Sequence, residues 1–471
     1  MQRDIRGLEV GTESEEAVRN LDLGVADYLD YGQTAGARVK AALEADSNFA
    51  LAQCYRGYLL MMLENRAVFP KIQATLDQLA AARDSMTRRE QLHADALQAW
   101  VNGDLISACL AWEAILAEWP RDLMALKLHH TMAFYTGRSH VLRSVVEGVL
   151  GEWDETTPGY SNVQGMYAYA LEECGDYENA ERWGREATER NPGDLWAIHS
   201  VAHVLEMQGR YAEGSKWLDY PAEHWADKNF FKAHVWWHNG LFALAQEKYD
   251  DALRILDEEM ASVNSDKYVD VSNQAALLKR LEIAGVNVGD RWDALAAHSE
   301  TRINDHILPF RDAHFCLSLA ARGKFDVARE QIDSLFTFAR SGEGWTADTT
   351  EKILIPLCEA MIAYEAGEYG KACDILWPLR NEMAPIGGSL AQRDLFTQIL
   401  IDSAVRAKRL GMARSLLSER VARFPGARRN WSDYASVLAD LGETDRAAQA
   451  RSRASELETG ASHARTKEAI Q

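Results

Sequence analysis

Apolar residues recur along this chain with the spacing of amphipathic helices, and one short motif separates many of the helical runs. The motif is a glycine, one further residue, an aromatic or aliphatic anchor, two residues and an alanine. Its anchors are Leu105, Tyr177, Tyr211, Tyr249, Phe325, Tyr369 and, in a weak last copy, Thr444. Glu247 takes the glycine place before Tyr249, and Gly214 takes the alanine place after Tyr211. No run of any length alternates with the period of a β-strand, so the pattern predicts helices and almost no sheet.

The distances between anchors indicate the architecture. Tyr177 and Tyr211 are 34 residues apart, and the next anchor, Tyr249, follows after 38. A period near 34 residues with two helices per unit is the signature of tetratricopeptide repeats. One such unit leaves an apolar face open, so the units must stack on one another. We therefore predict an all-α, tetratricopeptide-like α-solenoid of about a dozen helical pairs, curled into a superhelix.

The prediction is one continuous solenoid in four parts. N-terminal helical repeats occupy 1–150, central repeats 151–340 and C-terminal repeats 341–455, and a polar tail follows over 456–471. The repeat period drifts, and inserts are expected at 219–230, 260–270 and 341–350.

Composition and charge narrow the function classes. The 471 residues carry a formal net charge of −20 and are 26% charged and 47% hydrophobic. So acidic a chain is a poor ligand for nucleic acid or for an anionic membrane. No stretch approaches the ~18 apolar residues of a membrane span. The six cysteines are scattered without a Cys-x-x-Cys, as in reduced proteins. We expect a cytoplasmic protein with no nucleic-acid or membrane partner; a homodimer is possible, because solenoid ends must be capped or paired.

Two His-x-x-x-His pairs are the most informative polar feature. His199 with His203, and His234 with His238, each have the spacing of four that places both side chains on one helix face. Glu206 extends the first face by three residues. In a tetratricopeptide unit the first helix lines the concave surface, and counting back from the anchors places these residues there. The same count adds further residues to the inner wall: Tyr169, Glu172, Trp237 and His314.

Three interpretations of this wall remain open. It can be an acid–base site, with His199, His203, Glu206, His238 and His314 as catalytic groups and Tyr169, Glu172, His234 and Trp237 binding a ligand. It can hold a divalent metal ion on His199, His203, His234 and His238. It can also be plain packing between helices. A zincin motif is absent, because Ser200 rather than Glu follows His199.

Other polar residues have weaker patterns. Asp312 can fix the tautomer of His314 or simply favour a helix N-terminus. Arg393, after Gly387-Gly388-Ser389, can help to bind an anionic ligand, although an ordinary capped helix is the simpler reading. His93 and the His129–His130 pair are expected to be hydrogen-bonding or packing residues.

The predicted function is small-molecule binding by a concave His/Glu/Trp pocket, with acid–base or metal-assisted chemistry of a hydrolytic or proton-transfer kind. The cofactor is unknown beyond a possible divalent metal, since no nucleotide, flavin or nucleophilic-serine motif is present. The alternative is a non-catalytic scaffold that binds a peptide or protein in the groove.

The sequence also resembles the tetratricopeptide repeat protein 38 family, the StaR-like proteins, from about residue 90 to 420. The resemblance is carried by Pro158-Gly159-Tyr160, Gly165-Met166-Tyr167, His199-Ser200-Val201-Ala202-His203, Trp236-Trp237-His238, Asp305-His306-Ile307-Leu308, Asp312-Ala313-His314-Phe315 and Ala391-Gln392-Arg393-Asp394-Leu395-Phe396. It implies an all-helical protein with degenerate repeats, and it includes the same histidine segments.

Overall fold

The computed structural model describes residues 2–219, 224–225, 227–229, 231–261 and 268–458. Parts of the predicted inserts 219–230 and 260–270, and the predicted tail beyond residue 458, lie outside the described residues.

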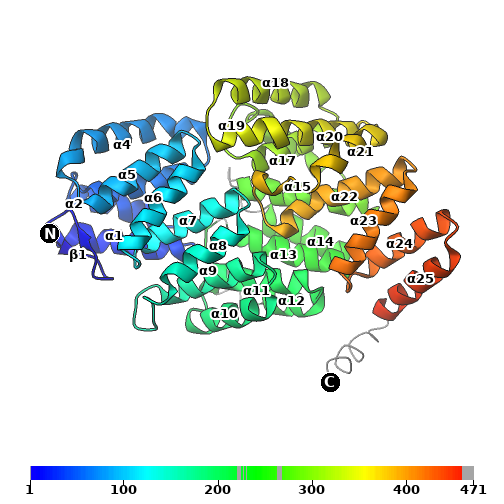
Figure 1. Cartoon of the computed structure of the whole chain (residues 1–471), viewed down its shortest axis with the longest axis horizontal. Coiled ribbons are helices and arrows are strands. Elements are labelled where there is room, and N and C mark those ends of the chain that lie inside the picture. Colours follow the sequence, from blue (N-terminus) through cyan, green and yellow to red (C-terminus); the bar gives the residue numbers. More distant parts are fainter. Residues whose placement is uncertain (1, 220–223, 226, 230, 262–267, 459–471) are drawn as a thin grey trace.

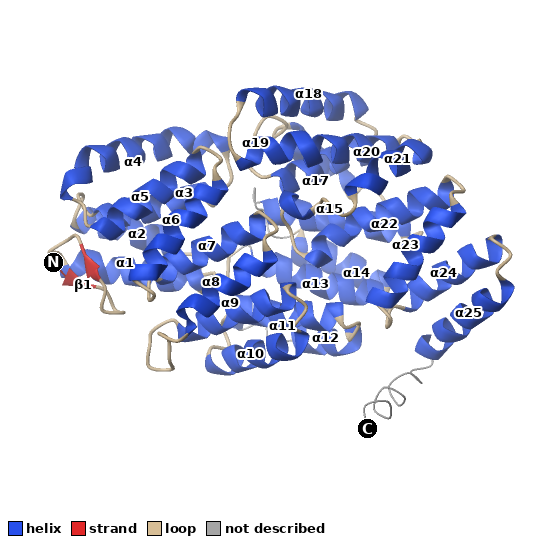
Figure 2. Cartoon of the chain, in the orientation of Figure 1, coloured by secondary structure: helices blue, strands red, loops and turns tan. Residues whose placement is uncertain are grey.

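The described chain is almost entirely helical (Figures 1 and 2). The helices of the first half are α1 (Glu15–Leu29), α2 (Ala35–Ala45), α3 (Ala50–Met61), α4 (Phe69–Ala82), α5 (Arg88–Val101), α6 (Leu105–Glu118), α7 (Leu123–Tyr135), α8 (Ser139–Leu150), α9 (Tyr160–Glu173), α10 (Tyr177–Arg190), α11 (Leu195–Met207) and α12 (Tyr211–Leu218). Those of the second half are α13 (Phe231–Ala245), α14 (Tyr249–Arg254), α15 (Tyr268–Ile283), α16 (Trp292–Glu300), α17 (Pro309–Ala321), α18 (Phe325–Ser341), α19 (Trp345–Thr349), α20 (Ile355–Glu365), α21 (Tyr369–Leu379), α22 (Leu390–Arg406), α23 (Leu410–Arg423), α24 (Arg428–Asp440) and α25 (Thr444–Glu458).

Short segments complete the secondary structure. Three are 3-10 turns, η1 (Arg66–Val68), η2 (Arg83–Ser85) and η6 (Ala384–Ile386), and two are π-helical turns, η4 (Ile255–Met260) and η5 (Thr350–Leu354). Strands β1 (Gln2–Arg3) and β2 (Glu9–Val10) form an antiparallel ribbon in which Gln2 lies opposite Val10. The prediction of helices with almost no sheet is therefore confirmed.

The repeat motif marks the turn inside each helical pair. Every predicted anchor is the first residue of a second helix: Leu105 of α6, Tyr177 of α10, Tyr211 of α12, Tyr249 of α14, Phe325 of α18, Tyr369 of α21 and Thr444 of α25. The glycine two residues earlier has a positive φ, from 69° at Gly323 to 80° at Gly175. Glu247 adopts the same conformation with a φ of 59°. A left-handed residue with a Cβ costs about 1–2 kcal/mol, which explains the preference for glycine.

Sequence reasoning missed two copies of this turn. Lys408 has a φ of 56° immediately before α23, and Gly137 has a φ of 65° immediately before α8. Neither is followed by an aromatic anchor, because Leu410 and Ser139 begin those helices.

The first helices of the central pairs line up side by side, and distant parts of the chain close the curve. Helix α11 packs against α9 and α13, and α15 packs against α13 and α17. Helix α22 returns against α15 and α11. The N-terminal part is tied to later repeats by Arg311, which donates to the carbonyl of Glu64, and by the Thr346 hydroxyl, which donates to the carbonyl of Gly103 at 3.2 Å. The interior of the superhelix is thus filled by the chain's own helices.

None of the described helices combines the length and the apolar character that a membrane crossing needs.

Candidate metal centre

Four buried histidines from two neighbouring helices meet inside the superhelix. His199 and His203 project from α11, and His234 and His238 project from α13. One ring nitrogen from each lies within 4.8 Å of those of the other three. The Nε2 atoms of His199 and His234 are 2.9 Å apart. No side chain of the four is more than 5% exposed.

The start of α11 sets the register of the first pair. Asp194 is the N-cap, and its carboxylate accepts hydrogen bonds from the backbone N–H groups of Trp196 and Ala197. An N-cap of this kind fixes where the helix begins. His199, His203 and Glu206 then fall on successive turns of the face that looks toward α13 and α9.

Oxygen-bearing side chains hold three of the four rings by Nδ1. A carboxylate oxygen of Glu206 lies 2.8 Å from Nδ1 of His238. One helix earlier, a carboxylate oxygen of Glu172 lies 3.5 Å from Nδ1 of His203. The side-chain amide of Asn273, on α15, is 3.0 Å from Nδ1 of His234. A partner on Nδ1 directs the Nε2 lone pair inward, the usual arrangement around metal-binding imidazoles.

Several buried polar atoms of the cluster have no hydrogen-bond partner among the described residues. They are Nε2 of His203 and of His238, Nδ1 of His199, Oδ1 of Asn273 and the oxygens of Glu172. Each unpaired buried polar atom costs about 1–3 kcal/mol. A cation at the centre would take up the imidazole nitrogens. The Asn273 amide, turned over, would then accept from Nδ1–H of His234 and leave its Nε2 free. The donor set therefore fits a metal ion.

Burial keeps the four imidazoles neutral. It lowers the pKa of His199, His203 and His234 well below the usual value, and the neighbouring imidazoles lower these pKa values further. Burial lowers the pKa of His238 to about 3, with a smaller effect from Arg280. Neutral imidazoles have the free lone pairs that a metal needs.

The two carboxyl groups are affected in the opposite direction. Burial raises the pKa of Glu206 to about 8, against the attraction of Arg280. Burial, with the neighbouring charges of Glu173 and Glu206, raises the pKa of Glu172 well above its usual value. A dication beside them would favour their ionised forms.

Aromatic rings wall the cluster. The ring of Tyr169 is centred 5.5 Å from that of His199 and 5.3 Å from that of His203. On the other side, Trp237 stacks on His234 at 5.3 Å. Sequence reasoning also expected Trp236 at the rim, but this ring stacks on Trp225 at 4.9 Å instead, one residue round the helix.

His314, Asp312 and Arg393 lie apart from the four histidines. His314 packs between the rings of Phe310 and Phe396, and its Nδ1 lies 2.8 Å from the carbonyl of Phe310. The expected tautomer-fixing contact from Asp312 is therefore replaced by a backbone carbonyl of the same helix.

Arg393 lies at a capped helix start. Its guanidinium donates to the carbonyls of Gly388 and Gly387, and Ser389 forms a capping box with Gln392. These are the contacts of the capped-helix reading rather than those of an anion site.

Some residues of the site carried no local sequence signal. Asn273 lies 35 residues beyond His238, on a helix whose repeat turn was not recognised. Tyr31 and Phe231 stack at 4.2 Å, and Phe231 contacts the rings of His199 and His234, each at 5.2 Å. Tyr31 comes from the α1–α2 turn, and only the tertiary fold brings it here.

Comparison with known proteins supports the fold alone. No family model matches the chain. The human IFIT1 dimer with PPP-AAAA is 13% identical over 96% of each chain, with a TM-score of 0.41. The IFIT1 monomeric mutant with Gppp-AAAA is 14% identical over 95% of this chain and 91% of that one, with a TM-score of 0.34. The Naa15/Naa10 structure bound to HypK-THB is 12% identical over 96% of this chain and 73% of that one, with a TM-score of 0.27.

The repeats and helices place the chain in the class of tetratricopeptide-like α-solenoids. The narrower resemblance to the tetratricopeptide repeat protein 38 family stays a prediction.

Proposed function

We propose that this solenoid binds one divalent transition-metal ion on His199, His203, His234 and His238 and uses it in chemistry on a small molecule. The observation that supports the proposal is the convergence of four neutral, buried imidazoles, one nitrogen from each within 4.8 Å of the others. Imidazole nitrogens suit zinc, copper, iron and nickel rather than magnesium or calcium, which prefer oxygen.

The neighbouring groups favour acid–base chemistry beside the metal. Four neutral ligands leave the full charge of a dication at the centre, so a bound water or carbonyl oxygen would be strongly polarised. Glu206 and Glu172 would be proton acceptors close to it, because both carboxyl groups adjoin the imidazoles by Nδ1. Hydrolysis or proton transfer is therefore the proposed reaction type.

A small molecule suits the interior better than a peptide does. The groove that would take a peptide in an open solenoid is occupied on one side by α22. Leu390 donates its backbone N–H to Glu173 on α9 at 3.1 Å, and Arg280 on α15 donates to the carbonyl of Ala391 at 2.7 Å. These bonds bridge the walls of the groove through the chain's own helix. They argue against the scaffold alternative, in which that surface would be open.

Elemental analysis by plasma mass spectrometry on untagged protein purified without chelator tests the proposal. We expect about one metal equivalent in the wild-type protein and nearly none in the His203→Ala/His238→Ala variant. His140→Ala is the matched control, since His140 is exposed on α8 and should leave the metal content unchanged. Metal-free wild-type protein that also fails to take up added zinc, copper, iron or nickel would contradict the proposal.

A further inference from the structure

A lysine is buried beside the four-histidine centre. Lys127 lies on α7 with 4% of its surface exposed. Its Nζ donates a hydrogen bond to the hydroxyl of Tyr31 at 3.1 Å and lies 4.1 Å above the ring of Trp196. Trp196 is the next ring to His199, with centroids 5.0 Å apart. One indole therefore separates a buried ammonium from the metal-binding imidazoles.

This ammonium has no close counter-charge. Within the described residues, no carboxylate forms an ion pair with Lys127. Asp194 is near enough to stabilise the charged form. However, its Oδ1 accepts from the N-terminal backbone of α11, and its Oδ2 lies 3.4 Å from the Asn162 amide. Burial lowers the pKa of Lys127 to about 8, so the group still carries its proton at pH 7.

A buried charge without a paired counter-charge is costly to the fold. An isolated charge in the interior destabilises a protein unless an anion compensates it. A hydroxyl and an aromatic face compensate only part of that cost. Charges that weaken the fold in this way are typical of functional sites.

We propose that Lys127 anchors the carboxylate of a small planar substrate, whose other end lies against the four-histidine centre. The inference rests on the proposed function and names its substrate class. The walls between the two ends are flat and aromatic: Trp196, Phe231 and Tyr31 lie in mutual contact, with Tyr31 and Phe231 stacked at 4.2 Å. A planar body would stack between such rings, and a charge-assisted hydrogen bond would fix its carboxylate.

Tyr31 keeps the place of that carboxylate. Its hydroxyl occupies the donor direction of Lys127 that an anion would take. Its backbone is left-handed, with a φ of 57°, and its carbonyl accepts from the N–H of Asn229 at 2.6 Å. Left-handed non-glycine residues persist only where the surroundings hold them. The turn is thus held in position by contacts with the segment before α13.

Binding of benzoate, a planar carboxylate, compared with benzamide, its neutral isostere, tests the inference by isothermal titration calorimetry at pH 7. We expect benzoate to bind the wild-type protein and benzamide to bind at least about tenfold more weakly. Lys127→Met and Lys127→Gln should each weaken benzoate binding about tenfold or more, and Tyr31→Phe should tighten it several-fold by removing the competing hydroxyl. Equal affinity of wild type and both lysine variants for benzoate, or no benzoate binding at all, would overturn the proposal.

Thermal unfolding separates an anion site from a structural lysine. We expect Lys127→Met without ligand to melt at a temperature equal to or above that of the wild type, because an unpaired buried charge is removed. A large drop in melting temperature together with unchanged benzoate affinity would assign Lys127 a structural role and overturn the proposal.

The same titration on the His203→Ala/His238→Ala protein distinguishes the two proposals. If the metal proposal fails but the anion site is real, benzoate still binds and remains sensitive to Lys127→Met. If the metal binds and benzoate does not distinguish wild type from Lys127→Met, the anion inference alone is wrong.

Discussion

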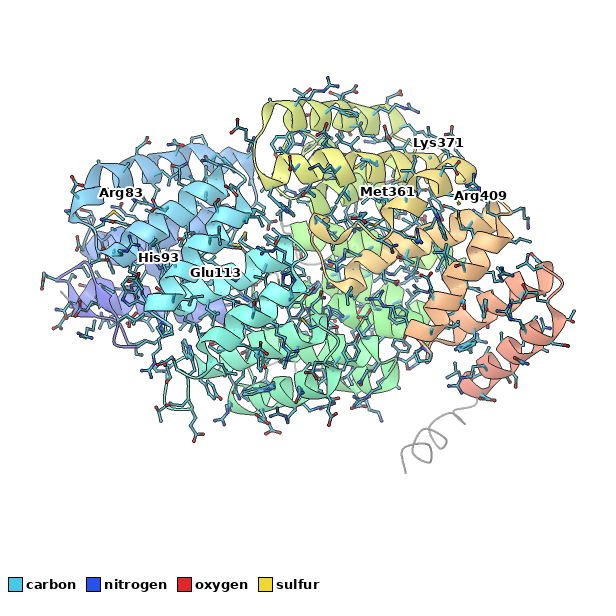
Figure 3. The ribbon with its side chains drawn as sticks, in the orientation of Figure 1. Arg83, His93, Glu113, Met361, Lys371 and Arg409 are labelled. Atoms are coloured by element: carbon cyan, nitrogen blue, oxygen red, sulfur yellow. The ribbon has the colours of Figure 1, made fainter. Side chains whose placement is uncertain are left out.

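Two buried histidine clusters in the same solenoid differ in how completely their hydrogen bonds are made. In the N-terminal repeats, His93 lies between Tyr58 and Asp122 (Figure 3). Its Nδ1 is 3.1 Å from the Tyr58 hydroxyl, and its Nε2 is 3.0 Å from Oδ2 of Asp122. The same Asp122 oxygen accepts from Arg89 at 3.2 Å. Both ring nitrogens of His203, by contrast, lack a hydrogen-bond partner among the described residues.

The difference shows what a repeat position can and cannot tell. His93 and His199 both fall at the fifth position of their units, counted from Leu105 and Tyr211. The first forms a closed hydrogen-bond network, which belongs to the fold. The second faces three other imidazoles, and a metal ion is the partner that its cluster fits. His129 and His130 belong with His93, because their Nε2 atoms lie 2.8 Å from Glu113 and 3.1 Å from the carbonyl of Met166. The expectation that these three histidines bond or pack is confirmed.

Breaking the N-terminal network should have the largest effect on stability. Burial raises the pKa of Asp122, but His93 and Arg89 outweigh that effect and hold the pKa below its usual range. Asp122→Ala would leave the buried Arg89 guanidinium without this partner and remove the N-cap of α7. We expect a loss of about 3–5 kcal/mol in the free energy of unfolding, measured with urea. Metal binding by the folded fraction should be unchanged, and a loss below 1 kcal/mol would show that the network is dispensable.

A second aspartate gives the opposite case. Burial raises the pKa of Asp312 to about 7, although Arg311 and Arg302 oppose the shift and Asp305 adds to it. Its Oδ1 has no hydrogen-bond partner within the described part of the chain. Because the folded-state pKa exceeds the unfolded value of 3.8, the folded protein retains the proton longer. Stability from this group is therefore greatest below about pH 4 and falls as the pH rises to about 7.

Asp312→Asn should remove this pH dependence. Between pH 4 and 8, its free energy of unfolding should gain on that of the wild type by up to roughly 4 kcal/mol. Urea unfolding of both proteins across this range is the measurement. Parallel pH curves would show that Asp312 is ionised in the folded protein at neutral pH.

Metal should stabilise one cluster and not the other. A ligand of the folded state present at 100 times its Kd adds about 2.7 kcal/mol to the free energy of unfolding. We expect added zinc to do so for the wild type and for a His93→Gln variant that folds, but not for His203→Ala. Equal stabilisation of His203→Ala would place the ion elsewhere.

The carboxyl groups behind the imidazoles should have a graded effect. Glu206→Gln keeps the shape of the side chain but weakens its hold on Nδ1 of His238. Changing such a partner typically weakens metal affinity about 10–100-fold. Competition with a chelating dye measures the change. Glu113→Gln, next to His129 in the N-terminal part (Figure 3), is the matched control and should leave the affinity unchanged.

The smallest effect concerns the repeat turns. Lys408 is exposed and left-handed at a place where most copies have glycine. Lys408→Gly should relieve strain and raise the free energy of unfolding by up to about 1 kcal/mol, with no effect on metal binding. Glu247→Gly should gain less, because Glu247 also pairs with Arg428 at 2.8 Å. Destabilisation by Lys408→Gly would show that the turn is unstrained.

Local pattern predicted the solenoid and the meeting of the histidines. The anchors Tyr177 and Tyr211 begin helices because the preceding glycine turn is a short-range signal. His199, His203, His234 and His238 share a wall because helical and repeat periods agree. The pairing of Glu206 with His238, a full repeat apart, follows from the same lattice but depends on side-chain reach that a spacing does not give.

Long-range contacts set the rest. Lys127 and Tyr31 reach the site from the N-terminal repeats, 72 and 168 residues before His199. Helix α22 enters the interior because the superhelix closes, and a repeat count describes neighbours only. His314 was placed on the same wall, yet packing against Phe396 of α22 keeps it apart from the four histidines.

Helix α22 also has a consequence for the order in which the protein is made. Helices α11 and α13 leave the ribosome before α22 exists, so the four imidazoles can come together while one side of the groove is still open. At about 5–20 residues per second, the chain from His238 to Leu390 takes roughly 8–30 s to synthesise. We expect an ion to enter most readily in that interval. Once α22 is in place, exchange of the ion would require the superhelix to open, so a finished molecule would keep the metal it first acquired.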